Sequence, residues 1–333
     1  MHCGHLQLGA NFDSRVVSRE AAKNAKEKLF VASREKCIHF KRRVPVCGVG
    51  SLVYHRRPMD ILLIIKTVIM GIVEGLTEFL PVSSTGHLIV ADALLNYSAG
   101  IGGKETAATF EIFIQLGAIL AVVVYFARDL ATLLRRALRE DAARRVLVNV
   151  AIAFVPAAAI GFLAKDFIKG VLFSTPTVGV ALILGGVIML WVEGRDHRSE
   201  TIDVEQMSFR QALVVGVAQV AALVPGMSRS ASTLIGGLFA GLDRSTALRF
   251  SFYLSIPTLG IATVYDFIKS RDAIHAEALP LFGIGTAVAF VVALIVVRFF
   301  LSYVSRRNLK PFGWYRIVAG VLLLAATAAG VVA

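Results

Sequence analysis

A short polar interruption in an apolar region decides the fold of this chain. Residues 74–87 read Glu-Gly-Leu-Thr-Glu-Phe-Leu-Pro-Val-Ser-Ser-Thr-Gly-His, and they separate an apolar block at 61–73 from another at 88–95. Each block is too short to cross a bilayer, which takes about 20 apolar residues. We therefore expect a re-entrant helical hairpin, whose irregular backbone must pack inside protein or line a wet cavity.

A second interruption of the same kind lies in the other half of the chain. Residues 225–233 read Pro-Gly-Met-Ser-Arg-Ser-Ala-Ser-Thr, between apolar blocks at 212–224 and 234–242. The segment Gly71-Ile72-Val73-Glu74 also parallels Gly216-Val217-Ala218-Gln219. These parallels predict an internal repeat with one hairpin in each half.

Six longer apolar blocks can each span a membrane: 109–127, 146–164, 176–193, 246–267, 279–301 and 313–332. The expected fold class is an all-α polytopic membrane protein with two inverted-topology repeats, 59–195 and 205–333. Each repeat would hold a re-entrant helical hairpin plus three transmembrane helices. An odd number of crossings per repeat inverts the second repeat relative to the first, so the two hairpins would meet near the midplane.

Composition excludes several classes of protein. The 333 residues are 56% hydrophobic and 17% charged, whereas soluble domains have about 25% charged residues. That excludes a soluble enzyme, and the long unbroken apolar blocks exclude an outer-membrane barrel, whose strands alternate. The net charge of +12 does not indicate nucleic-acid binding, and we expect none, because residues 1–58 alone contribute twelve Lys and Arg against four acids.

Residues 1–58 are polar and have no sustained apolar periodicity. The helical pattern begins abruptly at Met59. We interpret 1–58 as a disordered basic arm or a non-native upstream extension, and 59–333 as the membrane domain. N-terminal sequencing of the natively expressed protein would test whether Met59 is the native start.

The basic loops predict the orientation in the membrane. Arginines and lysines concentrate at 128–145 and 302–312, and such loops stay in the cytoplasm. The first hairpin and the C-terminus are then expected on the outer face. The basic arm would also lie outside, which the same rule disfavours.

Two acids in the first hairpin are candidates for metal binding or catalysis. Glu74 and Glu78 are spaced i, i+4, so they share one helix face. Two carboxylates this close in a low-dielectric site either share a proton or bind a divalent cation, and Mg²⁺ commonly takes one or two carboxylates plus substrate phosphate oxygens. A solvated helix end at the membrane surface is the alternative.

The hydroxyl-rich turn that follows is typical of an anion site. Ser83, Ser84 and Thr85, with backbone N–H groups at a helix start, can cradle a phosphate. His87 lies one turn after Ser84, and a hydroxyl beside a base is the arrangement for nucleophilic attack. The alternative for His87 is a capping residue at the interface.

The second hairpin supplies a cation. Arg229 is flanked by Ser228 and Ser230, with Thr233 one turn on, and its guanidinium suits bidentate phosphate binding. A structural pair with an acid of the first hairpin, or snorkelling to the surface, would also account for it. We expect Arg229 to lie close to Glu78 and Ser84.

Residues 74–87 and 225–230 closely resemble the two signature stretches of the bacterial undecaprenyl-diphosphate phosphatase family, the bacitracin-resistance proteins. The similarity runs through 110–117 and 250–252 and covers 59–333. One departure is Ala231-Ser232, where the family has Gly-Ala. Ala231 would be strained if that position needs a positive φ.

The resemblance implies an integral membrane enzyme that hydrolyses undecaprenyl diphosphate, recycling the lipid carrier for peptidoglycan synthesis and conferring bacitracin resistance. It implies a bacterial inner-membrane location and a site open to the periplasm. The implied catalytic residues are Glu74, Glu78, Ser84, His87 and Arg229; the hydroxyls expected to bind phosphate are Ser83, Thr85, Ser228, Ser230 and Thr233.

Several points stay open at this stage. Glu74 and Glu78 would hold the cation, Mg²⁺ or Ca²⁺. Water could attack directly while Ser84 only positions the substrate. The rival function is a lipid-phosphate flippase that uses the same anion site without hydrolysis. The sequence does not fix the oligomeric state, and a homodimer is one possible assembly.

Overall fold

The computed structural model describes residues 60–172, 174–195, 199–270 and 278–332. The expected arm at 1–58 and the start at Met59 lie outside the described residues. Within the described ranges the regular structure is helical, apart from an isolated bridge between Thr201 and Leu242. The chain is thus all-α, as expected.

Among the described residues, six helices are long and apolar enough to cross a membrane, which confirms a polytopic membrane protein. Their ends fall within a few residues of the apolar blocks in the sequence. They are α5 (Lys104–Tyr125), α7 (Asp141–Leu163), α9 (Thr175–Glu193), α12 (Arg244–Ser270), α13 (Leu279–Val304) and α14 (Lys310–Ala328).

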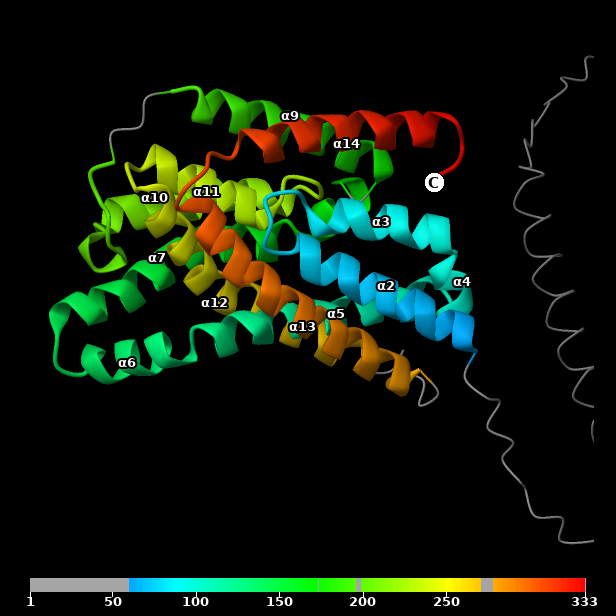
Figure 1. Cartoon of the computed structure of the whole chain (residues 1–333), viewed down its shortest axis with the longest axis horizontal. Coiled ribbons are helices and arrows are strands. Elements are labelled where there is room, and N and C mark those ends of the chain that lie inside the picture. The colour runs from blue at the N-terminus through cyan, green and yellow to red at the C-terminus, as the bar shows by residue number, and fades with distance from the viewer. Residues whose placement is uncertain (1–59, 173, 196–198, 271–277, 333) are drawn as a thin grey trace, which may run out of the picture. The chain divides into compact units, whose positions relative to one another are not determined.

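Four shorter helices form the two hairpins. They are α2 (Ile61–Thr77), α3 (Ser84–Leu95), α10 (Phe209–Val220), which continues in the turn η3 (Ala221–Leu223), and α11 (Arg229–Phe239). Helix α2 packs on α3, and α10 packs on α11. In Figure 1 the first pair comes in from the right and the second from the left, and their loops lie close together near the middle. The inverted symmetry of the complete halves stays a prediction.

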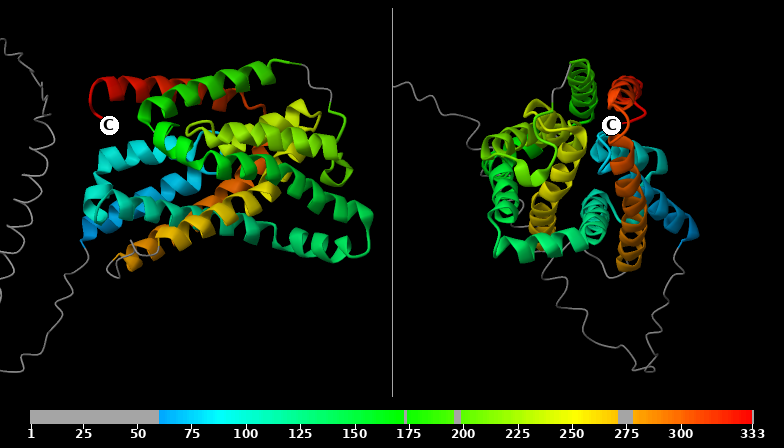
Figure 2. Two further views of the ribbon diagram at one scale, coloured as in Figure 1. Left: turned by 180° about the vertical axis from the view of Figure 1, so that it is seen from behind. Right: turned by 60° about the vertical axis from the view of Figure 1, so that its left-hand side comes forward.

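Helix α2 is fixed against the long helix α13 by two glycines. A Cβ on Gly71 would lie 2.7 Å from the carbonyl oxygen of Gly285, and one on Gly75 would lie 2.7 Å from that of Ala289. The absent side chains let the two backbones approach closely. Helix α14 lies alongside α9 at the edge of the bundle (Figure 2). The close contact between α2 and α13 holds Glu74, which lies between Gly71 and Gly75, deep in the bundle.

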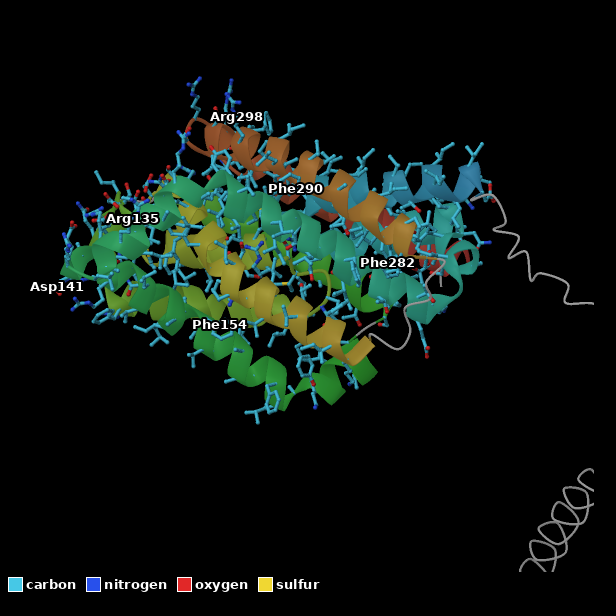
Figure 3. The ribbon with its side chains drawn as sticks, turned by 90° about the horizontal axis from the view of Figure 1, so that it is seen from below. Arg135, Asp141, Phe154, Phe282, Phe290 and Arg298 are labelled. Atoms are coloured by element: carbon cyan, nitrogen blue, oxygen red, sulfur yellow. The ribbon has the colours of Figure 1, made fainter. Side chains whose placement is uncertain are left out.

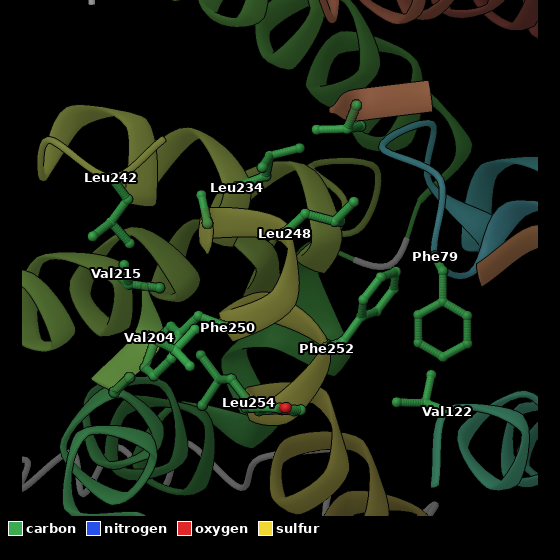
Figure 4. Close-up of a cluster of buried hydrophobic side chains, with 14 of the residues drawn as sticks. Phe79, Val122, Val204, Val215, Leu234, Leu242, Leu248, Phe250, Phe252 and Leu254 are labelled. Carbon is green, nitrogen blue, oxygen red and sulfur yellow. The ribbon is translucent and has the colours of Figure 1, made fainter. Parts of the chain in front are cut away.

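The loop of the first hairpin is anchored in the largest hydrophobic cluster. Phe79 is fully buried, and its ring meets that of Phe252 edge-on at 5.5 Å between centroids. Figure 4 shows Phe79 beside Phe252 and Val122, which come from α12 and α5. This packing positions Glu78, the preceding residue.

The basic segment at 128–145 is not a simple loop. It contains the amphipathic helix α6 (Ala127–Ala137), and Arg135 and Asp141 mark this charged end of the bundle in Figure 3. Arg136 pairs with Glu140 at 2.6 Å and with Glu205 at 2.8 Å. The remaining short elements are α4 (Tyr97–Ile101), α8 (Lys165–Phe167), η1 (Ile168–Leu172) and η2 (Val204–Gln206).

Candidate active site

The two hairpin loops share an uncommon backbone conformation. Ser83, the residue before α3, has φ 72° and ψ 103°, and Ser228, the residue before α11, has φ 68° and ψ 120°. Positive φ is rare for residues other than glycine, and such strain tends to cluster at ligand-binding sites. Both loops therefore use the same backbone turn to start the returning helix.

The first and second hairpins meet at one carboxylate. The hydroxyl of Ser84 donates a hydrogen bond to Oε2 of Glu78 at 2.7 Å. From the other hairpin, Nη2 of Arg229 lies 3.4 Å from Oε1 of Glu78. The Arg229 and Glu78 side chains are only 8% and 6% exposed, so the expected contact between hairpins is present and largely shielded from solvent.

Arg229 is held in place from several sides. Its guanidinium carbon lies 5.5 Å from the centroid of the Phe79 ring. Its Nη1 donates to the carbonyl oxygen of Ser251 at 3.2 Å, and the Ser251 hydroxyl lies 2.6 Å from that of Thr233. The Nε of Arg229 is buried and has no hydrogen-bond partner among the described residues. The guanidinium thus keeps a free donor.

Glu74 is the most isolated charged group of the site. It is 1% exposed, and both its carboxylate oxygens are buried without a hydrogen-bond partner in the described part of the chain. Gln219, its counterpart in the predicted repeat, is also 1% exposed and has an unpaired Nε2. A buried carboxylate without donors must be neutralised by a proton or a cation, so Glu74 suits either.

The loops enclose a cavity of about 150 Å³. Its polar wall combines Glu78, Ser83, Ser84 and Thr85 of the first hairpin with Ser228 and Arg229 of the second, and Gln115 of α5 joins them. The residues include a hydroxyl bonded to a carboxylate and an arginine from the facing loop. Such a set can bind an anion and place an oxygen nucleophile beside it.

Comparison with known proteins identifies the family. A sequence profile of the family described as bacitracin resistance protein BacA matches residues 67–322.

The chain belongs to the BacA family.

Several relatives match most of this chain and nearly all of their own length. The protein named undecaprenyl-diphosphatase 1 of Chromobacterium violaceum is 45% identical, over 81% of this chain and 98% of its own. The undecaprenyl-diphosphatase of Nitrosomonas europaea is 46% identical over 82% and 98%, and that of Ectopseudomonas mendocina is 46% identical over 80% and 95%. Each match thus spans about four-fifths of this chain and nearly the full length of the relative.

In this BacA protein, His87 does not pair with Ser84, its expected partner. Its Nδ1 lies 2.7 Å from the carbonyl oxygen of Ser83, and its Nε2 lies 2.6 Å from the hydroxyl of Tyr315. Because a carbonyl only accepts, Nδ1 carries the proton, and in the neutral imidazole Nε2 accepts from Tyr315. Both ring nitrogens are thus engaged, and Ser84 instead bonds to Glu78. The expected Ser84–His87 pair is replaced by a Ser84–Glu78 pair.

The predicted phosphate-binding hydroxyls divide into two groups. Ser83, Thr85 and Ser228 line the cavity. Ser230 instead donates to the carbonyl oxygen of Leu80 at 2.9 Å, which joins the two loops, and Thr233 donates to the carbonyl oxygen of Arg229 at 2.9 Å. Ser230 therefore joins the two hairpins, Thr233 bonds within α11 and to Ser251 of α12, and neither lines the cavity of the BacA site.

The departure at Ala231 proves harmless to the backbone. Ala231 lies in the first turn of α11, and its N–H donates to the hydroxyl of Ser228 at 3.3 Å. The positive φ belongs to Ser228 instead. The strain expected at Ala231 is absent because the returning helix has already begun there.

Sequence reasoning missed Arg316, in α14. Its side chain is completely buried, and it donates to the carbonyl oxygens of Pro81 at 3.2 Å and Gly226 at 3.1 Å, one from each loop. It also donates to those of Leu182 and Ala181 in α9. A Cβ on Gly185 would collide with this guanidinium. An arginine inside an apolar span was the available signal.

Proposed function

We propose that this chain is a membrane phosphatase that hydrolyses undecaprenyl diphosphate to undecaprenyl phosphate and phosphate. The observation that carries the proposal is the hydrogen bond from Ser84 to the buried Glu78, in a cavity that also presents Arg229. A carrier that moves a lipid phosphate needs an anion site but no nucleophile beside a proton acceptor. The names of the relatives point to the same activity.

The proposed chemistry starts from the bond between Ser84 and Glu78. Glu78 accepts the hydroxyl proton while Ser84 Oγ attacks the terminal phosphorus in line. The bond from that phosphorus to the bridging oxygen breaks, and undecaprenyl phosphate leaves. Water then attacks the phosphorus of the phosphoserine, and the bond from that phosphorus to Ser84 Oγ breaks. Phosphate leaves with the protons of the water, and Glu78 returns its proton to Ser84 Oγ. Arg229 and the N–H groups of the loops stabilise the charge that develops on the phosphate oxygens.

His87 takes a positioning role in this proposal. Its Nδ1–H donates to the carbonyl oxygen of Ser83, the residue that carries the strained backbone turn before Ser84. Tyr315 donates to Nε2 and stacks its ring on that of His87 at 5.6 Å between centroids. The pair holds the first turn of α3, so that Ser84 faces Glu78.

Glu74 and Glu78 would hold a divalent cation, Mg²⁺ or Ca²⁺, with substrate phosphate oxygens as further ligands. The unpartnered carboxylate oxygens of Glu74 support this. The described residues offer no group of three or more acids, histidines or cysteines for a cation, so the protein alone supplies a small part of the shell, as Mg²⁺ sites often do. Bound there, the cation supplies neutralisation of the diphosphate charge.

We further propose that the protein lies in the bacterial inner membrane and that its site opens to the periplasm. The support is the basic end of the bundle around α6, which the positive-inside rule assigns to the cytoplasm. Cysteine labelling from outside intact spheroplasts tests this. Cysteines at Asn96 should react, and those at Arg139 should react only after lysis.

Phosphate release from undecaprenyl diphosphate by the purified protein in detergent tests the function, because no transport is possible there. Wild type should release phosphate and Ser84→Ala should not. Acid-quenched wild type should yield phosphoserine at Ser84 when the substrate carries labelled terminal phosphate. Release without a trapped phosphoserine would indicate direct attack by water; binding without release would indicate a flippase.

A further inference from the structure

An apolar groove of about 450 Å³ runs next to the candidate active site. One wall comes from α3, with His87, Ala91 and Leu94, and the other comes mainly from α14, with Tyr315 and Ala319. Apart from His87 and Tyr315, every residue that lines the groove is apolar. The groove is therefore polar at one end only.

The groove follows two helices that run in the same direction. In Figure 1, α3 and α14 lie near each other and both lead from the hairpin loops toward the right-hand end of the bundle. Along α14 the lining residues Tyr315, Ala319, Leu322 and Ala326 recur at helical spacing, which puts them on one face. The eleven steps from Tyr315 to Ala326 rise about 1.5 Å each, so this face is roughly 16 Å long.

The polar end of the groove adjoins the cavity. Ser83, Ser84 and Thr85 line the cavity, and the next two residues, Gly86 and His87, line the groove. The His87 ring bridges the two, because its Nδ1 is bonded to Ser83 while the ring forms part of the groove wall. The polar cavity and the apolar groove are therefore only one turn of α3 apart.

We propose that the groove binds the first isoprenoid units of a polyprenyl chain whose diphosphate occupies the cavity. The inference rests on the proposed function and adds a binding site for the chain. Such a lipid has a polar head that suits the cavity and an apolar tail that suits the groove. The bilayer is itself apolar, so the groove acts through shape: it places the terminal phosphorus relative to Ser84 by holding the chain.

Small residues that give the groove its depth provide the test. Ala319→Phe and Ala326→Phe fill it, and Ala325→Phe is the matched control, because Ala325 is exposed on α14 and does not line the groove. For each variant, kcat/KM is measured in detergent on undecaprenyl diphosphate and on dimethylallyl diphosphate, which has a single isoprenoid unit.

Filling the groove should lower kcat/KM for undecaprenyl diphosphate about tenfold, the scale of a steric mismatch in an apolar pocket. For dimethylallyl diphosphate, whose single unit reaches only the polar end of the groove, Ala326→Phe should keep the value within about twofold of wild type. Ala325→Phe should change the value for neither substrate. Equal values for all three variants on the long substrate would overturn the groove inference and leave the proposed function intact. A wild type that releases phosphate from neither substrate would instead overturn the function.

A second measurement uses the unmodified protein and does not depend on how the variants fold. A polyprenyl diphosphate with a photoreactive group in its second isoprenoid unit should label peptides from 86–94 and 315–332. Unlabelled undecaprenyl phosphate should compete, and a bilayer phospholipid should not. Labelling on α7 or α10 would overturn the inference, and so would competition by phospholipid alone, which would mark the groove as a site for ordinary membrane lipid.

Discussion

Ser84 Oγ lies 2.7 Å from Oε2 of Glu78, across the loop that joins α2 to α3. The other oxygen of the same carboxylate faces Arg229 of the second hairpin. One buried acid thus joins the hydroxyl of one hairpin to the guanidinium of the other.

Glu78→Gln should lower kcat by roughly 10²- to 10⁴-fold, the usual contribution of a general base. His87→Gln should cost less than about tenfold, because His87 contacts Ser83 and Tyr315 rather than the attacking hydroxyl. Phosphate release in detergent measures both. The double variant Ser84→Ala/Glu78→Gln should be no slower than Ser84→Ala alone, since residues that act as a unit are not additive. A larger loss in His87→Gln than in Glu78→Gln would restore His87 as the base.

Arg229→Lys should lower kcat/KM by about two orders of magnitude, close to the loss on removing one charge-stabilising donor. Lysine keeps the charge but loses the planar fork that contacts two oxygens at once. The same change at Arg249, which pairs with Asp129 at a partly exposed position, is the control and should leave turnover near wild type. Unchanged turnover in purified Arg229→Lys would remove the guanidinium from the mechanism.

Arg316→Ala should destabilise the protein and lower its activity together. The substitution removes the donor to the loop carbonyl oxygens of Pro81 and Gly226, and each buried group left unsatisfied costs about 1–3 kcal/mol. Thermal unfolding in detergent should show a midpoint several degrees below wild type. Arg298→Ala, at an exposed position on α13, should change the midpoint little. A normal midpoint in Arg316→Ala would contradict the role of Arg316 in holding the loops.

The ion pairs at the basic end should weaken in acid. The hydrogen bond from Arg136 lowers the pKa of Glu140 below its usual value of 4.5. A depressed folded-state pKa contributes stability above pH 4.5, and that stability is lost as pH falls through the folded value. The midpoint difference between wild type and Arg136→Gln should therefore shrink below pH 4.5. A constant difference from pH 7 to pH 3 would contradict this.

Much of the fold could be predicted because the bilayer restricts what an apolar segment can form. Six spans and two hairpins follow from block lengths and from the polar turns at 81–87 and 225–233. Helix α6 was harder to predict, since its pattern of arginines also reads as a basic loop. Its apolar face buries Leu133 and Ala137, and Arg136 contacts Glu205, a residue far away in the chain.

The sequence placed Glu78, Ser84 and Arg229 near one another, as the structure has them, but it did not predict how they pair. Spacing along α3 suggests His87 for Ser84, whereas the strained turn at Ser83 directs the serine hydroxyl to Glu78 and leaves the imidazole to Tyr315. Tyr315 belongs to the last long apolar block, at 313–332. Its partner lies 228 residues away in the sequence, so no local pattern indicates it.

Arg316 places a mechanical restriction on the two halves of the molecule. Its guanidinium binds a carbonyl oxygen in each hairpin loop, and Ser230 adds a direct bond between those loops. Any rocking motion that parts the halves must first rupture these links. A lipid headgroup bound between the two loops therefore meets a rigid site. Phosphate must then leave by a route that does not require the loops to separate.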